Sequence, residues 1–236
     1  MVSTQSTGED FLLRVSLWWW LGVVVAPFLL TTIVLTAVFT ATGGESPIPH
    51  LSIAVYSILC VFVVASLTQW LSPAIRTKML PTHIPTRTEV GVAVVATLVT
   101  ILVFDPIATF AASVLGSGDG NTGSFNSLLG IAIFGVSSVV IAPVVEEYLF
   151  RGVALDALRS RYGVVVAVVG SSAVFGGIHL LLGGVSGIVS ASLSGVVYAG
   201  VRVEFENLTG AIVAHSFNNL YWVLVMAGLV PNIVPG

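Results

Sequence analysis

Long apolar runs separated by short polar segments make up most of the chain. Because the hydrocarbon core of a bilayer is about 30 Å thick, a helix needs roughly 20 predominantly apolar residues to cross it. Seven runs approach or exceed this length, and they cover residues 17–41, 51–71, 90–104, 127–150, 163–182, 184–201 and 208–230. The pattern therefore predicts an all-α fold, a polytopic membrane bundle of about seven to eight helices.

The third run ends at Asp105-Pro106, which has two interpretations. Asp is a frequent N-cap residue and Pro a frequent first helical residue, so a short interfacial helix would begin here and extend over residues 106–115. In the alternative, one kinked helix continues through the pair and leaves the Asp105 carboxylate in lipid.

The composition supports the membrane assignment. Hydrophobic residues make up 56% of the sequence and charged residues 8%, a balance that is not typical of water-soluble domains. The formal net charge is −3, and eight Lys and Arg residues leave no basic surface for nucleic-acid phosphates, so we expect no nucleic-acid partner. The single Cys60 excludes an internal disulfide, and its apolar surroundings indicate a packing role.

Loop charges predict the orientation in the membrane, because Lys and Arg in short loops favour the cytoplasmic side. With a cytoplasmic N-terminus, the seven runs leave seven cations in cytoplasmic segments, namely Arg14, Arg76, Lys78, Arg87, Arg159, Arg161 and Arg202. The opposite loops 42–50, 116–125 and 231–236 contain no Lys or Arg. We therefore expect a multi-pass protein of the cell membrane, surrounded by the lipid bilayer, whose N-terminus is cytoplasmic.

The Gly- and Ser-rich stretch 116–125 is predicted to be a flexible linker between two unequal regions. Before it, charges are confined to loops, which is typical of a scaffold. After it, the membrane segments contain ionisable residues. The predicted divisions are a cytoplasmic N-terminus (1–16), N-terminal membrane helices (17–115), the linker (116–125), a catalytic helical core (126–230) and a C-terminal tail (231–236).

The six residues from Glu146 to Arg151 include three charged side chains in or beside a span. Each charge there costs about 2.5 to 3.5 kcal/mol unless it has a partner or a function. Glu147 and Arg151 are four residues apart on one helical face and are expected to pair, in either a structural or a catalytic role. Glu146 points elsewhere and has no evident local cation, so it is a candidate catalytic residue. Its structural alternative is a protonated carboxyl bonded to a neighbouring helix.

Two further helices carry polar residues at helical spacing. Phe175 lies one turn before His179, and His215 lies one turn before Asn219, with Asn218 as an alternative to Asn219. Polar side chains stacked on one helical face in lipid are unfavourable unless they meet other polar groups. The predicted site therefore consists of Glu146, His179, His215 and Asn219, with Glu147, Arg151, Phe175 and Asn218 in supporting positions.

These residue types admit two mechanisms of peptide-bond hydrolysis. Without a metal, Glu146 acts as the general base on water, His179 helps to hold that water, and His215 and Asn219 donate hydrogen bonds to the oxyanion. With a metal, Glu146, His179 and His215 are ligands of zinc, and water takes the fourth position. Asn219 favours the metal-free mechanism, since an amide is a poor zinc ligand and a good oxyanion donor. The sequence also lacks the His-Glu-x-x-His motif of conventional zincins.

Together the three motifs resemble those of the CPBP intramembrane proteases, which are named for CAAX-processing and bacteriocin-processing enzymes and are also called the Abi family. Glu146-Glu147-x-x-x-Arg151 resembles the family's Glu-Glu-x-x-x-Arg motif, Phe175-x-x-x-His179 its Phe-x-x-x-His motif, and His215-x-x-x-Asn219 its His-x-x-x-Asn motif. The resemblance covers residues 140–220.

The resemblance implies an integral membrane endopeptidase whose helical core surrounds a cavity open to water, and whose substrate is a peptide or a lipidated protein. Family members that process prenylated CAAX proteins remove a C-terminal tripeptide after lipidation, and others are linked to bacteriocin maturation or self-immunity. The family is often catalogued as metalloproteases, whereas the mechanism favoured here uses the first Glu of the motif to activate water. The alternative from another functional class is a transporter or channel in which buried Glu, His and Arg form an ion or proton relay.

The three motifs lie at different sequence distances from the predicted loops, so straight helices perpendicular to the membrane would not bring them together. We therefore expect helices to tilt or break, with irregularities at Pro143, Gly176-Gly177 and Gly183-Gly184. Near the loops, Asp156 and Arg159 are expected to form a helix-end pair.

Overall fold

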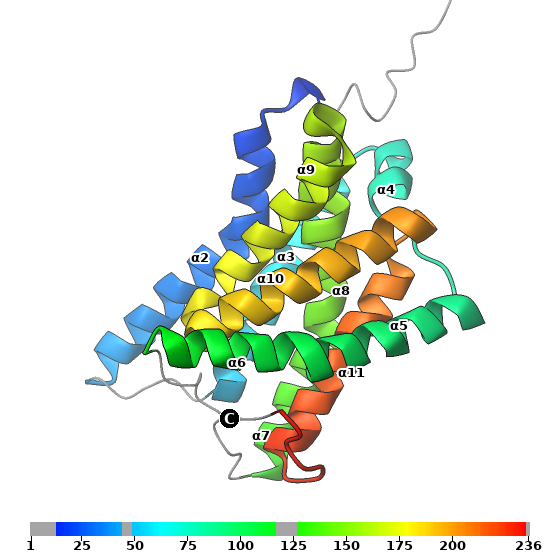
Figure 1. The fold of residues 1–236 in the computed structure, drawn as a ribbon. Coiled ribbons are helices and arrows are strands. Elements are labelled where there is room, and N and C mark those ends of the chain that lie inside the picture. The colour runs from blue at the N-terminus through cyan, green and yellow to red at the C-terminus, as the bar shows by residue number, and fades with distance from the viewer. Residues whose placement is uncertain (1–12, 44–48, 117–126, 235–236) are drawn as a thin grey trace, which may run out of the picture.

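The computed structural model describes residues 13–43, 49–116 and 127–234 of the 236-residue chain. Every regular element in these ranges is helical and none is a strand (Figure 1), so the predicted all-α class is confirmed. Much of the predicted N-terminal segment 1–16 and of the predicted linker 116–125 lies outside the described residues.

The elements follow one another with short connections. Those of the first half are α2 (Leu17–Ala41), α3 (Pro49–Trp70), α4 (Pro73–Met79), α5 (Arg87–Val99), the π-helical turn η1 (Thr100–Phe104) and α6 (Asp105–Val114). Those of the second half are α7 (Leu128–Gly135), η2 (Val136–Ile141), α8 (Ala142–Glu147), η3 (Tyr148–Ala154), α9 (Leu155–Ile178), α10 (Leu180–Phe205) and α11 (Thr209–Met226).

Five stretches of the described chain are long and apolar enough to cross a membrane, which makes this a multi-pass membrane protein. They are Leu17–Ala41, Leu51–Trp70, Arg87–Val114, Leu128–Ile178 and Gly183–Phe205.

The predicted number of seven spans differs from this for two physical reasons. Runs 127–150 and 163–182 both fall in the fourth stretch, whose backbone leaves helical geometry at Gly163 (φ 80°), so it consists of two helices. The last predicted run, 208–230, corresponds to α11, which is not among the five. Its polar side chains, His215 and the two asparagines among them, lower its hydropathy.

The Asp105-Pro106 pair does not begin a separate helix. Asp105 has helical φ and ψ of −66° and −43°, and its N–H bonds the Thr100 carbonyl five residues back. This π-helical turn lets the helix continue past Pro106, which has no N–H to donate. The Asp105 carboxylate does not lie in lipid either, because it is buried and accepts a hydrogen bond from the Ser190 hydroxyl of α10.

Two of the expected irregularities are present and one is not. Pro143 follows the π-helical turn η2, and the backbone of Gly184 is non-helical with φ 58°. Gly176 and Gly177 remain helical, since α9 continues to Ile178. At Gly176 the missing side chain serves close packing instead, because a Cβ there would lie 2.8 Å from the Ile188 carbonyl oxygen of α10.

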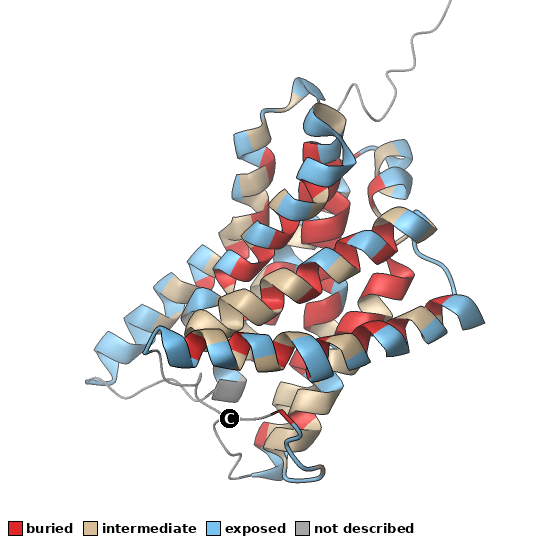
Figure 2. Ribbon diagram, in the orientation of Figure 1, coloured by how far each residue is buried: buried red, intermediate tan, exposed pale blue. Residues whose placement is uncertain are grey.

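Large apolar side chains are exposed over much of the described surface, where a soluble protein would be polar. Figure 2 shows the exposed positions along the outer faces of the helices. Phe62, Phe110 and Val165 are each exposed by two thirds or more, at 67%, 69% and 72%. Such a surface would aggregate in water and is solvated by lipid tails in a bilayer. Charged residues lie inside instead, among them Glu147 and Arg151, which are completely buried.

The helices that carry the motifs pack directly on one another. Figure 1 shows α9 and α10 crossing the bundle obliquely, and these two helices pack along each other. The helix formed by α5, η1 and α6 lies across α10 and α11. At the loop end of the bundle, Asp156 does not pair with Arg159 as expected; its Oδ2 lies 3.5 Å from Arg202 Nη2 of α10.

Candidate active site

Glu147 is the centre of a buried charge cluster at the end of α8. Its Oε1 lies 3.2 Å from Arg151 Nη1, so the ion pair expected from the four-residue spacing is present. The same oxygen lies 2.9 Å from His215 Nδ1 of α11. One carboxylate oxygen therefore joins a local partner with a partner from a helix 68 residues away.

Arg151 is surrounded by aromatic rings and one carbonyl. Its guanidinium carbon lies 4.4 Å from the centroid of the Phe175 ring and 5.5 Å from that of Tyr198. Its Nη2 donates to the Gly195 carbonyl of α10 over 3.2 Å. A buried cation requires compensation of this kind, and here an anion, π faces and a carbonyl supply it.

His215 stands between the two glutamates. Its Nδ1 bonds Glu147, and its Nε2 lies 3.7 Å from Glu146 Oε2. Because a carboxylate only accepts, Nδ1 carries the hydrogen, and Nε2 is the atom that faces Glu146. Tyr198 stacks on the imidazole at 5.2 Å between ring centroids and an interplanar angle of 18°, which fixes the plane of the ring.

His179 lies at the junction of α9 and α10 and is half-buried. Its Nδ1 bonds the Phe175 carbonyl over 2.8 Å. A carbonyl oxygen only accepts, so Nδ1 carries the hydrogen and the neutral ring presents an Nε2 lone pair. The Phe175 ring contacts both imidazoles, at 4.7 Å from His179 and 5.7 Å from His215 between centroids.

Asn219 of α11 bonds the backbone of η2, the π-helical turn before Pro143. In this turn the Ala142 N–H bonds the Ser137 carbonyl, and the residue that would serve the Ser138 carbonyl in the same way is Pro143, which has no N–H. The Asn219 Nδ2 donates to that Ser138 carbonyl over 2.7 Å. This hydrogen bond from Asn219 therefore gives the Ser138 carbonyl the donor that Pro143 cannot supply.

A cavity of about 170 Å³ lies among the predicted site residues. Its lining includes Phe175, His179, His215, Asn218 and Asn219. Glu146, 5% exposed, lies against His215 beside it, whereas Glu147 and Arg151 are fully buried behind the imidazole. The structure thus brings together the residues of all three motifs.

The predicted zinc ligands do not form a metal site as they stand. Among the described residues, no group of three or more His, Cys, Asp or Glu side chains could hold a metal ion. The Nδ1–H groups of the two imidazoles donate to Phe175 and Glu147, which leaves Nε2 of each ring as the atom that could bind a metal.

Sequence reasoning missed several residues that shape the site. Tyr198 and Gly195 of α10 contact His215 and Arg151, yet neither residue belongs to one of the three motifs. A Cβ at Gly195 would lie 3.2 Å from Arg151 Nη2, so glycine leaves room for the guanidinium. Cys60 is fully buried, as its packing role predicts.

Comparison with known families supports the same region. Residues 128–221, which include all three motifs, match the family model described as Rce1-like, type II CAAX prenyl endopeptidase. The comparisons with curated proteins and with solved structures gave no match. The family match confirms the resemblance to CAAX proteases and supports an intramembrane protease as the general class.

Proposed function

We propose that this chain is an intramembrane endopeptidase that hydrolyses a peptide bond of a prenylated or otherwise lipidated substrate, because residues 128–221 match the Rce1-like family model. The observation that carries the proposal is the contact of Glu146 and Glu147 with one imidazole, that of His215, beside a cavity that His179 also lines. Two imidazoles and an amide that line one cavity, with a carboxylate beside it, are sufficient for water activation and oxyanion binding.

Glu146 is the proposed general base. The 3.7 Å between Glu146 Oε2 and His215 Nε2 is too long for a direct hydrogen bond and leaves room for a water that contacts both atoms. The lone pair of His179 Nε2 is proposed to orient that water. The water transfers a proton to Glu146 as its oxygen attacks the scissile carbonyl carbon. When the intermediate collapses, the same carboxyl group gives this proton to the leaving amine.

His215 and Asn219 are the proposed oxyanion donors. A protonated His215 donates through Nε2, and the Glu147 carboxylate on Nδ1 stabilises that imidazolium and holds the ring in place. Asn219 uses one N–H for Ser138, and its amide carries a second N–H that we assign to the oxyanion. Glu147 and Arg151 are positioning residues in this proposal, because they act on the reaction through His215.

The central test is Glu146→Gln, which keeps the shape of the side chain and removes the base. We expect kcat/KM for a prenylated peptide substrate to fall about 10²- to 10⁴-fold, with the fold retained. Glu204→Gln, an exposed change on α10, is the matched control and should leave kcat/KM unchanged. Comparative membrane proteomics of the two strains should reveal an uncut precursor with Glu146→Gln alone.

The transporter alternative predicts a different outcome of the same substitution. In a proton relay, Glu146→Gln would alter proton flux into proteoliposomes and leave peptide cleavage as it was. Full peptidase activity of the Glu146→Gln protein would therefore contradict the proposed function.

Chelation separates the two mechanisms of water activation. Since Glu146 is proposed to activate water directly, we expect the purified enzyme to keep its activity after EDTA treatment, with no stoichiometric zinc in metal analysis. Activity that is lost on chelation and restored by zinc would instead favour Glu146, His179 and His215 as metal ligands in the active enzyme.

A further inference from the structure

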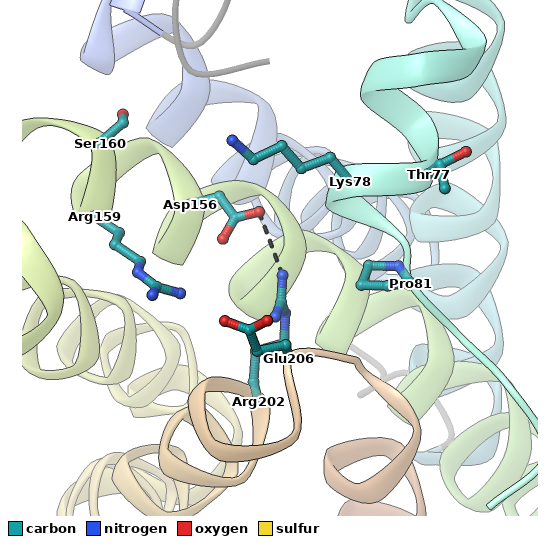
Figure 3. A pocket seen from close by; sticks show the side chains of 8 residues that line it. All are labelled: Thr77, Lys78, Pro81, Asp156, Arg159, Ser160, Arg202 and Glu206. Atoms are coloured by element: carbon teal, nitrogen blue, oxygen red, sulfur yellow. Dashed lines mark ion pairs between the residues drawn. The ribbon is translucent and has the colours of Figure 1, made fainter. Parts of the chain in front are cut away.

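A second polar cavity, of about 420 Å³, lies between α4, α9 and α10 and is separate from the candidate active site (Figure 3). Three of the eight Lys and Arg residues of the chain line it, namely Lys78, Arg159 and Arg202. The carboxylates of Asp156 and Glu206 also line it, so positive charge exceeds negative charge by one. A cavity lined by three cations in a chain of net charge −3 suits an anionic ligand.

The floor of this cavity is built from buried polar groups. Asp156 and Arg202 form an ion pair of 3.5 Å and are only 7% and 5% exposed. Within the described part of the chain, Asp156 Oδ2 and Arg202 Nε have no hydrogen-bond partner. Buried polar atoms left in this state are unfavourable, so a ligand that accepts from Arg202 and donates to Asp156 would satisfy both.

Lys78 and Arg159 supply further positive charge from two other elements. Figure 3 shows their side chains extending from α4 and α9 toward the space beside the Asp156–Arg202 pair. Both cations line the same cavity as Asp156. A phosphate group fits this arrangement, because its oxygens accept several charge-assisted hydrogen bonds from Lys and Arg at once.

The position of the cavity identifies where the phosphate comes from. Asp156 and Arg159 lie just before the break of α9 at Gly163, and Arg202 lies in the last turn of α10, which ends at Phe205. These are the ends of membrane-spanning stretches, at the level of the lipid headgroups. The geometry points to a phosphate-binding site in this cavity, occupied by the headgroup of an anionic phospholipid whose glycerol hydroxyl donates to Asp156. Free phosphate is the other source of the same chemistry.

The test measures thermal unfolding of the purified full-length protein in detergent. The probes are phosphatidylglycerol, phosphatidylcholine with the same acyl chains, and inorganic phosphate against sodium chloride of equal ionic strength. The variant is the double substitution Lys78→Gln and Arg159→Gln, which leaves the buried ion pair intact. The control is Arg87→Gln, which removes a charge from an exposed residue outside the cavity.

We expect phosphatidylglycerol to raise the unfolding temperature of the wild type and of Arg87→Gln more than phosphatidylcholine does. The apparent affinity should fall about tenfold or more in the double variant. Stabilisation by inorganic phosphate that the double variant loses would support the site with free phosphate as its ligand. Equal responses of all three proteins to each probe, or no response in any of them, would overturn the proposal.

Discussion

At the scale of single residues, the charged neighbours of Glu146 and Glu147 explain why we propose Glu146, and not Glu147, as the base. Glu147 is fully buried and shares one oxygen between Arg151 and His215, so its negative charge is already engaged. Glu146 has no arginine or lysine partner among the described ion pairs, and its nearest charged neighbour there is His215 at 3.7 Å. A carboxylate that no arginine holds is the better base, because taking a proton then breaks no guanidinium ion pair.

The position of His179, and with it the direction of its Nε2 lone pair, depends on Gly187 of α10. A Cβ at Gly187 would lie 2.8 Å from the His179 carbonyl oxygen, so Gly187→Ala must displace the residue. Because a shift of about 1 Å in a catalytic group can reduce the rate 10²-fold, we expect kcat to fall at least about tenfold. Peptide cleavage by the folded fraction from size-exclusion chromatography measures this effect.

Gly200→Ala is the matched control for that substitution. Gly200 lies on the same helix, and a Cβ there meets no atom within 4 Å. Since alanine is the better helix former, we expect unchanged activity and a gain of about 0.5 to 1 kcal/mol in the free energy of unfolding. Equal activity of the Gly187→Ala and Gly200→Ala proteins would show that the close approach at Gly187 does not position His179.

At the scale of helices, each of two prolines follows a π-helical turn by two residues. Pro106 follows η1 and Pro143 follows η2. In both turns the last N–H before the proline bonds a carbonyl five residues back. The wider turn thus keeps the helix continuous although proline has no N–H to donate. One backbone carbonyl is left without a helical donor and needs another partner.

This view of η2 predicts an energetic coupling between Pro143 and Asn219. In the wild type, Asn219→Ala leaves the Ser138 carbonyl without its donor and should lower the free energy of unfolding by about 1 to 3 kcal/mol. Pro143→Ala provides an N–H at the position that would serve Ser138, so the loss in that background should be smaller by about 1 kcal/mol. A double-mutant cycle of unfolding in detergent measures the difference.

Asn218→Ala provides the comparison, since Asn218 is adjacent in sequence and its Oδ1 has no hydrogen-bond partner within the described residues. Its effect on the free energy of unfolding should be the same in both backgrounds. An Asn219→Ala loss that is equally independent of Pro143 would mean that the π-helical turn does not create the need for the amide.

Local spacing predicted the helices and the pairs within them, and long-range packing determined the rest. The Glu147–Arg151 pair follows from one helical turn and is present. The contact of Glu147 with His215 joins residues 68 positions apart, and no pattern in either helix encodes it. Gly176 was expected to break a helix and instead permits a close helix contact, because glycine favours both outcomes and only the neighbouring helix decides between them.

At the scale of the whole molecule, tilted helices bring motifs of different depth together. Figure 1 shows α9 and α10 running obliquely to the steeper α8 and α11. Gly163 within α9 and Gly184 within α10, both at positive φ, break the helical geometry of these two helices and so permit this slope. Helix tilt is set by packing against neighbours, which is why the hydrophobic pattern predicted that a tilt was needed but not which helices would take it.

The orientation of the bundle in the membrane is a prediction that the charge pattern makes. Figure 1 shows the C-terminal end of α2 far from α4, so Thr42 and Ser72 lie toward opposite ends of the bundle. Both residues are exposed, and the native Cys60 is fully buried and unreactive by position. Single substitutions Thr42→Cys and Ser72→Cys therefore report the two sides separately.

Because the Lys and Arg residues outside the spans lie at the Ser72 end in the predicted topology, we expect that end to be cytoplasmic. A membrane-impermeant thiol reagent should label Thr42→Cys in intact cells and Ser72→Cys only after permeabilisation. The reverse pattern would place the N-terminus and the cationic cavity of Lys78 and Arg159 on the outer face. A substrate lipidated in the cytoplasm would then have to reach the candidate site from the opposite side of the membrane.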